Sequence, residues 1–244
     1  MRKHLRLGRV AVTALALIVF LVQPLEVILH AAVTEVAHDV TNDRANVADS
    51  TTFTGSAGDT YVVGIVRTDG TGTFSMADTV NGSWGAAAIT EGSDTWVFDK
   101  RNVSAGLTTV NLTCTDGVSH YSATWLHIRG HDTSASLLTD TNTGDSGTSH
   151  TAATTGLTGT GMIIGLGANN SLVDVTLGSG YTSDNTLTAV GYMLERKIGT
   201  FSAEKPPWTT SASDSAHGLA ILFVEATGGG GVAPGLGVLL GAGR

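Results

Sequence analysis

The stretch from Asp140 to Asp145 carries the side chains whose spacing best suits a metal ion. Asp140, Asn142 and Asp145 place carboxylate and amide oxygens near alternate positions, with Gly144 among them, as calcium-binding loops do. The twelfth position of such a loop is Thr151, where an EF-hand supplies a bidentate Glu. The same residues suit an Asx-rich turn between two strands, which we prefer. Calcium at Asp140, Asn142 and Asp145 is the best metal hypothesis that the sequence offers.

Three histidines, His120, His127 and His131, lie close together in the chain, and Asp132 follows the last of them. Neutral imidazoles and a carboxylate can hold zinc. Two histidines four residues apart share a face only on a helix, however, and this part of the chain has the pattern of a strand. We therefore expect ordinary strand and turn histidines here.

Two tryptophans, Trp84 and Trp208, are the best candidates for stacking on a sugar, because both lie in turn-rich stretches. A carbohydrate-binding face needs planar aromatic rings exposed on one side of the domain. The alternative, which we favour, is that both rings cover the ends of a hydrophobic core.

Signatures of catalysis are missing from the sequence. It contains no G-x-S-x-G nucleophile elbow. Gly159-Thr160-Gly161 and Gly165-Leu166-Gly167 flank a strand instead of joining a strand to a helix, so they do not form a phosphate cradle. No pair of acids is marked out by its surroundings as the two carboxylates of a glycosidase. We expect a protein that is not an enzyme and needs no cofactor beyond the calcium considered above; a hydrolase is our last hypothesis.

The composition excludes further classes of protein. Charged residues make up 14% of the chain, and the formal net charge is −8. Such a chain lacks the clustered Lys and Arg that a phosphate backbone requires, which excludes nucleic acid as a partner. The single cysteine, Cys114, excludes a disulfide framework and a thiolate zinc site. With 41% hydrophobic residues, the chain can bury a core.

The elements that must position these residues are strands. Between residues 33 and 226, short runs are bounded by Gly, Asn, Asp or Ser, and no helical period is sustained. Asn81-Gly82 indicates a hairpin, because both residues tolerate positive φ. The charged run Glu195-Arg196-Lys197 is expected on a solvated strand face. The expected strands are Thr34–Val40, Thr51–Gly55, Thr60–Thr68, Thr73–Ala77, Thr95–Arg101, Thr108–Cys114, Ser119–Arg129, Ser136–Asp140, Gly161–Gly167, Asp174–Leu177, Thr188–Lys197, Thr200–Ala203 and His217–Glu225.

These strands predict one all-β domain, residues 33–226, because no linker interrupts them. Many short strands separated by turns indicate an antiparallel β-sandwich of two sheets, jelly-roll-like in topology.

Both ends of the chain differ from this domain. In residues 1–32, four basic residues precede Val10–Val22, a run of thirteen uncharged residues. As a helix this run is about 20 Å long, short of the ~30 Å hydrocarbon core of a bilayer. Residues 1–32 therefore predict a signal peptide, an uncleaved anchor that meets the membrane through residues 10–33, or an apolar N-terminal helix buried in an assembly. Residues 227–244 predict a Gly-rich tail that docks on a neighbouring subunit or frays.

Several motifs occur in an order that resembles a known group of β-sandwich domains. WLHIRGHDTSASLLTD, Trp125 to Asp140, contains an Arg-Gly-x-Asp-Thr corner, and TGDSGTSHTAATTGLTGTG and MIIGLGANN follow it. YMLERKIGTFSAE, Trp208 and HGLAILFVEA complete the order, and TVNGSWGAAAI precedes it. Over roughly residues 50–226 the chain thus resembles the jelly-roll-like domains of phage virion proteins and secreted bacterial surface proteins. His131 stands where the corner of that group has an apolar residue. The resemblance implies display, decoration or adhesion, and no catalytic residues.

Together these features predict a non-enzymatic structural or surface protein, a subunit or decoration of a virion or of an extracellular assembly. Its partners would be further copies or other structural subunits, because strands with few charges suit large interfaces that desolvate little charge. The alternative is a secreted carbohydrate-binding or adhesion module with a cell-surface glycan as its partner. Either protein would reside in a virion or outside the cell.

Overall fold

The computed structural model describes residues 32–45, 48–115, 120–171, 173–183 and 191–226. These residues form fifteen β-strands in antiparallel sheets, and the described part of the chain contains no helix. The predicted all-β class and the antiparallel pairing are therefore confirmed. The predicted apolar helix within residues 1–32, apart from Ala32, and the predicted tail over residues 227–244 lie outside the described residues.

The strands vary widely in length. In chain order they are β1 (Thr34–Ala45), β2 (Asp49–Gly55), β3 (Thr60–Asp69), β4 (Thr73–Asp78), β5 (Gly82–Ser83), β6 (Ile89–Glu91), β7 (Thr95–Arg101), β8 (Gly106–Thr115), β9 (His120–Arg129), β10 (Leu138–Thr151), β11 (Leu157–Asn169), β12 (Val175–Leu177), β13 (Thr182–Ser183), β14 (Tyr192–Glu204) and β15 (Pro207–Val224).

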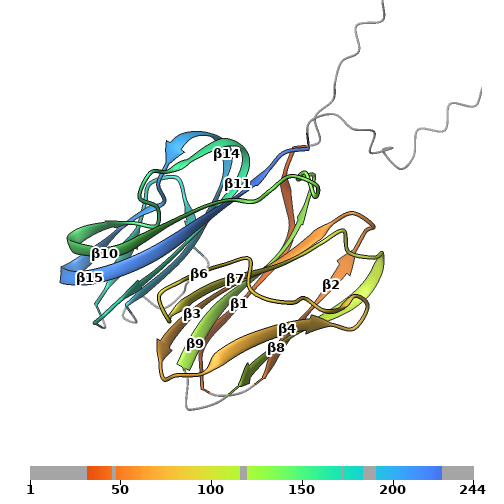
Figure 1. The fold of residues 1–244 in the computed structure, drawn as a ribbon, viewed down its shortest axis with the longest axis horizontal. Coiled ribbons are helices and arrows are strands. Elements are labelled where there is room, and N and C mark those ends of the chain that lie inside the picture. Colours follow the sequence, from red (N-terminus) through yellow and green to blue (C-terminus); the bar gives the residue numbers. More distant parts are fainter. Residues whose placement is uncertain (1–31, 46–47, 116–119, 172, 184–190, 227–244) are drawn as a thin grey trace, which may run out of the picture.

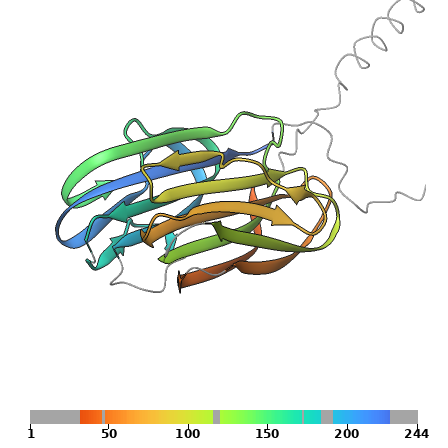
Figure 2. The ribbon, with the colours of Figure 1, turned by 60° about the horizontal axis from the view of Figure 1, so that its bottom comes forward.

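Three sheets stack as layers (Figure 1). The middle sheet has the strand order β1-β9-β3-β7-β6. On one side of it lies the β8 sheet, β2-β8-β4-β5, and on the other the β15 sheet, β10-β15-β11-β14-β13, in which β12 also pairs with β15. In Figure 2 most strands run along the long axis of the molecule. The expectation of two sheets is corrected to three within the described residues.

The third layer exists because the central strands of the middle sheet are apolar on both faces. Successive side chains of a strand point to opposite faces. On β3, Val63 and Ile65 pack against the β8 sheet, while Val62 and Val66 pack against the β15 sheet. A strand of this kind is buried on both faces. In a two-sheet sandwich each strand has one face toward solvent, so such a strand needs a third layer.

The neighbouring strand β9 repeats this division. Trp125 joins the core that faces the β8 sheet, together with Phe53 and Leu112. Leu126 and Ile128 join the core that faces the β15 sheet. Two hydrophobic cores, one on each side of the middle sheet, therefore hold the three layers together.

A third apolar cluster lies on the outer face of the β15 sheet, where strands β10 and β15 fold back over it. The pairing of these two strands shifts register between Asn142 and Asp145 and again between Gly147 and Ser149, and such irregularities bend a strand pair. Trp208 of β15 consequently lies against Gly218 of the same strand and against Gly167 of β11. Two residues ten positions apart can touch in this way only because the strand reverses between them.

The β9–β10 connection carries the chain from the middle sheet to the β15 sheet. Gly130 turns it with a φ of 83°, and the Asp132 carboxylate accepts hydrogen bonds from the amides of Ser134 and Ala135. Both ends of the described domain meet this corner. Residue Thr34 pairs with Arg129, and the Ala226 amide donates to the Gly130 carbonyl.

Most predicted strands are present, and the three largest differences of extent are the following. β10 continues from Leu138 to Thr151, through residues that were expected to form a turn. The two strands expected at Thr188–Lys197 and Thr200–Ala203 are one strand, β14. β15 begins at Pro207, ten residues earlier than expected. The Asn81-Gly82 hairpin is confirmed, since it joins β4 to β5 with Gly82 at a φ of 72°.

A search for membrane-spanning helices among the described residues finds none that is long and apolar enough.

The close approach of Trp208 to Gly167 makes a stability prediction. A methyl group on Gly167 would lie 2.7 Å from two ring carbons of the buried Trp208, so Gly167→Ala overpacks this layer and should lower the free energy of unfolding by about 1–3 kcal/mol. Gly199→Ala is the matched control, because the nearest atom to its methyl group is 3.7 Å away. Urea denaturation measures both variants. Equal stabilities of the two variants would contradict the packing described for Trp208.

Candidate functional site

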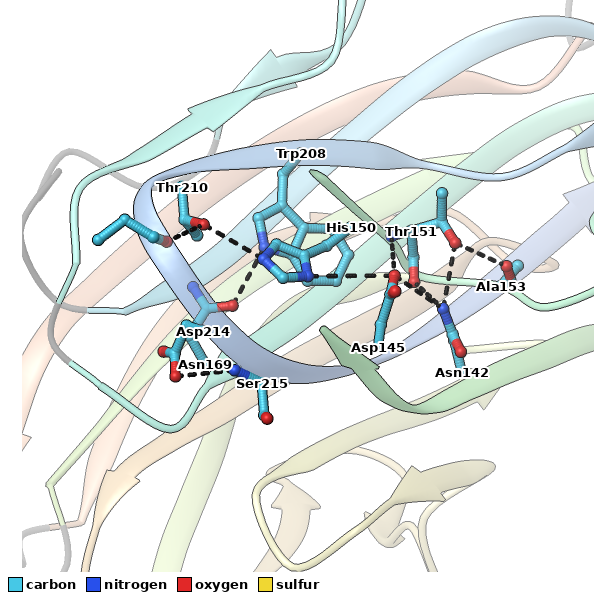
Figure 3. Close-up of polar contacts among 11 residues, drawn as sticks. Asn142, Asp145, His150, Thr151, Ala153, Asn169, Trp208, Thr210, Asp214 and Ser215 are labelled. Carbon is cyan, nitrogen blue, oxygen red and sulfur yellow. Dashed lines mark hydrogen bonds and ion pairs between the residues drawn. The ribbon is translucent and has the colours of Figure 1, made fainter. Parts of the chain in front are cut away.

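The sequence singled out five residues as metal or sugar ligands. The folded-back ends of β10 and β15 bring three of them together. Asn142 and Asp145 lie on β10, and Trp208 lies on β15 (Figure 3). Between them is His150, which is buried and whose ring centroid lies 5.3 Å from that of Trp208. We call Asn142, Asp145, His150, Trp208 and their polar partners the His150 site.

The contacts of His150 place an acid, an imidazole and a hydroxyl in a row. The Nδ1 atom of His150 lies 4.0 Å from Oδ2 of Asp145, and its Nε2 atom lies 3.2 Å from Oγ1 of Thr210. Thr210 Oγ1 in turn donates to the carbonyl of Ala212 at 2.8 Å. The Thr210 hydroxyl therefore accepts from Nε2–H of His150. In a nucleophilic triad the hydroxyl donates to the imidazole, so the polarity here is the reverse of a catalytic one.

The predicted calcium ligands do not converge on one point. Asn142 donates its Nδ2 to Asp145 Oδ2 at 3.2 Å and to the Thr151 carbonyl at 3.0 Å, so its amide nitrogen, and not its oxygen, faces the carboxylate. Asp140 binds elsewhere and accepts the amide hydrogens of Thr155 and Gly156 at 2.8 and 2.7 Å. All three residues lie on a strand instead of a loop, which argues against the calcium hypothesis.

The hydrogen bonds to Asp140 affect its ionisation. Burial opposes its charge, but the amide of Gly156 and the amide and hydroxyl of Thr155 hold the pKa of this carboxyl below its usual value. The carboxylate thus closes the turn between β10 and β11. Among the described residues, no group of three His, Cys, Asp or Glu side chains is placed to hold a metal ion.

The two predicted sugar-stacking tryptophans are both buried, with 9% of Trp84 and 1% of Trp208 exposed. Trp84 donates its Nε1 to Asp78 Oδ2 at 2.7 Å at one end of the β8 sheet, and Trp208 donates to Asn169 Oδ1 at 3.3 Å. Neither ring offers a face to a sugar. The alternative that both rings cover core ends agrees with these positions, and the burial of Trp84 and Trp208 argues against the use of either as a sugar ligand.

The three clustered histidines also have separate surroundings. The buried His127 contacts Asp59, with Nε2 2.7 Å from Oδ2, and Arg129 binds the same carboxylate with two nitrogens at 2.7 Å. His131 packs against the ring of Phe223, and burial lowers its pKa to about 4. His120 lies at the opposite end of β9 from His127. The histidines are strand and corner residues, as preferred from the sequence.

The sequence interpretation of Glu195-Arg196-Lys197 as a solvated face is wrong for the first two residues, which are buried. Arg196 reaches across to β1, where its Nε and Nη2 donate to the Glu35 carboxylate, the latter at 3.0 Å. β14 lies between two layers, the middle sheet and the folded-back residues, so both of its faces are covered. The apolar run Met193-Leu194 beside these charges was the signal for this burial.

Glu195 has the surroundings of a functional acid, and the sequence did not indicate them. Its side chain is buried, and neither carboxylate oxygen has a hydrogen-bonding side chain among the described residues. Burial raises the pKa of Glu195 to about 8, against a weaker opposing effect of the Gly178 backbone. The carboxyl is thus largely protonated at neutral pH.

A second acid, Glu204, lies in the same region with a different environment. It accepts hydrogen bonds from Lys197 Nζ at 2.9 Å and from the Tyr181 hydroxyl at 2.8 Å. Burial opposes its charge, but these two donors hold the pKa of Glu204 below its usual value. Two acids with opposite pKa shifts are typical of acid–base catalysis. Here the protonated member, Glu195, is fully buried.

Other ionic contacts join one sheet to another. Asp94, in the β6–β7 turn, lies 3.0 Å from Nη2 of Arg67 and 3.2 Å from Nε2 of His217 on β15. The hydrogen bond with Asp94 raises the pKa of His217, and the one with His217 lowers that of Asp94. Together with Glu35–Arg196, this contact fastens the β15 sheet to the middle sheet.

The buried imidazole of the His150 site makes a prediction about stability. Thr210→Val removes the acceptor for His150 Nε2–H, and a buried donor without a partner costs about 1–3 kcal/mol. Thr210→Ser keeps the hydroxyl and should retain most of that stability. Chemical denaturation compares the two variants. If Thr210→Val and Thr210→Ser have the same free energy of unfolding, the hydrogen bond with His150 does not stabilise the folded-back ends of β10 and β15.

The raised pKa of Glu195 makes a prediction about pH. Because the folded state holds this proton up to about pH 8 and the unfolded state releases it near 4.5, the stabilisation is complete below pH 4.5 and is lost as the pH rises through about 8. At its steepest, the free energy of unfolding falls by about 1.4 kcal/mol per pH unit. Glu195→Gln, which cannot ionise, should remove this slope from unfolding measurements between pH 5 and about 8.5.

Glu204→Gln provides the control for that experiment. Its carboxyl is ionised in both states over this pH range, so the variant loses stability but keeps the slope. A wild-type slope that survives Glu195→Gln would show that another group causes it.

Neither a scan against models of protein families nor a search of curated proteins finds a match to this chain.

Proposed function

We propose that this chain is a non-enzymatic building block, a structural or surface subunit of a virion or of an extracellular assembly. The observation that carries the proposal is that both ends of the described domain meet at one corner, beside Arg129 and Gly130. The first and last described residues therefore lie at the same end of the domain (Figure 1). Two arms from one end can tie neighbouring subunits together and leave the rest of the body free.

The charges of the body support the same proposal. Glu35–Arg196 and Asp94–His217 fasten sheet to sheet, and Asp59 holds the end of β9 through Arg129. These ion pairs join the middle sheet to the β15 sheet and hold one end of the middle sheet, which suits a part that bears load or is displayed. The corner from Arg129 to Thr133, which carries the chain between sheets, supports the resemblance to jelly-roll-like virion and surface domains, although the jelly-roll topology itself stays a prediction.

The second candidate, a secreted carbohydrate-binding or adhesion module, is less well supported. It relied on Trp84 and Trp208 as exposed rings, and both are buried. We therefore rank the structural subunit first.

Measuring the native chain tests this function directly. Intact mass and light scattering should show a full 24.9 kDa chain inside a larger assembly. Deleting residues 1–32 or 228–244 should reduce assembly while the thermal transition of the body stays unchanged. A native chain that begins near residue 32 and remains a monomer, or truncations that assemble normally, would reject the arms and favour the secreted module.

A further inference from the structure

The outer side of the β8 sheet is an exposed sheet surface, and Figure 2 brings it forward. Its strands alternate cleanly. Phe53, Phe74 and Val110 point into the core, and the residues between them point outward. We call the outward set the β8 face: Ser50, Thr52, Thr54, Thr73, Ser75, Ala77, Leu107, Thr109, Asn111 and Thr113.

Strand pairing makes this face continuous. Thr54 is the partner of Leu107, and Thr52 is the partner of Thr109. On the other side of β8, Ser75 is the partner of Thr113. Neither pairing shows a register shift, in contrast to the irregular pairings of β1 and β10. The outward side chains therefore form regular rows.

The β8 face carries no charged side chain, whereas the chain as a whole has a net charge of −8. Exposed or half-exposed positions of the other sheets do carry charges, such as Asp39 on β1, Asp140 on β10 and Lys197 on β14. Leu107 is 70% exposed, the most of any large hydrophobic residue in the described part of the chain. Two acidic molecules repel each other least when they approach through uncharged surfaces such as the β8 face.

We propose that the β8 face binds the same face of a second copy of this chain. The hydroxyl of Thr or Ser both donates and accepts hydrogen bonds, so a Thr- and Ser-rich face is complementary to itself. A two-fold axis through the face would place each Leu107 against the partner copy's β8 sheet and would leave no charge to desolvate. A basic partner would instead be drawn to the acidic surfaces. This inference rests on the proposed function, since it names the contact that the assembly would use.

The size of the face sets the strength of the contact. The three strands that carry the face, β2, β8 and β4, lie about 4.8 Å apart, and six or seven residues of each at about 3.3 Å per residue cover roughly 300 Å². This is below the roughly 800 Å² per partner of a stable dimer. The association should therefore be weak in isolation, with a Kd between about 1 µM and about 1 mM, and become firm when other contacts hold many copies together.

Sedimentation velocity over that range of concentrations tests the proposal on the full-length chain. The average mass should rise with concentration, and it should rise further with added salt, because salt screens the repulsion between acidic bodies. Leu107→Glu and, independently, Thr54→Glu should weaken association at least about tenfold, since each sets like charges against each other across the axis. Both positions are exposed, so circular dichroism and melting temperature should match the wild type.

Ile198→Glu on β14 is the matched control. Ile198 is 49% exposed and lies on another sheet, so this variant should associate as the wild type does. A wild type that stays monomeric up to about 1 mM, or Leu107→Glu and Thr54→Glu variants that associate normally, would overturn the proposal. If the native chain still assembles with Glu at position 107, the proposed function stands and the β8 face is the wrong contact. If the native chain is a cleaved monomer, the function itself fails.

Discussion

The structure depends on one constraint, that the middle sheet is buried on both faces along its central strands. Its central strands β3 and β9 must supply two cores at once, so almost every side chain on them is excluded from water. Hydrophobic burial on both sides is the dominant favourable contribution to such a stack. It also means that every polar group on these strands needs a partner inside the protein, because water cannot reach it.

That requirement explains where the ionisable groups lie. Charged groups taken out of water must be paired, and the pairs occur at ends and seams of the sheets. Asp59 joins His127 to Arg129 at the end of β9, and Arg196 crosses to Glu35 at the edge of the middle sheet. Glu195 has no cation in hydrogen-bonding contact among the described residues, and burial keeps it protonated instead. Pairing and proton uptake are thus two solutions to the same desolvation problem.

Local pattern was enough to find most strands, because alternation and turn residues act over a few positions. It could not give the number of sheets, since that depends on which strands lie opposite each other across long sequence distances. The reversal of β10 and β15 was missed for the same reason. Register shifts near Asp145 and the fit of Trp208 over Gly167 cause it, and neither has a local sequence signature. Asn142, Asp145 and Trp208 of the His150 site were therefore named from the sequence, but His150, Thr210 and the shared location of these residues were not.

The difference between enclosed and exposed groups also governs what this protein can do. Asp145, His150 and Thr210 form a row that resembles a triad, yet the Thr210 hydroxyl donates to the Ala212 carbonyl and accepts from His150, the reverse of a triad hydroxyl. His150 and Thr210 are buried in the folded-back layer, while Asp145 is partly exposed. The β8 face is exposed, regular and uncharged, which are properties of a contact surface. An acidic body with such a face can approach its own copies there with little electrostatic cost, which is the physical basis of the assembly proposed for this chain.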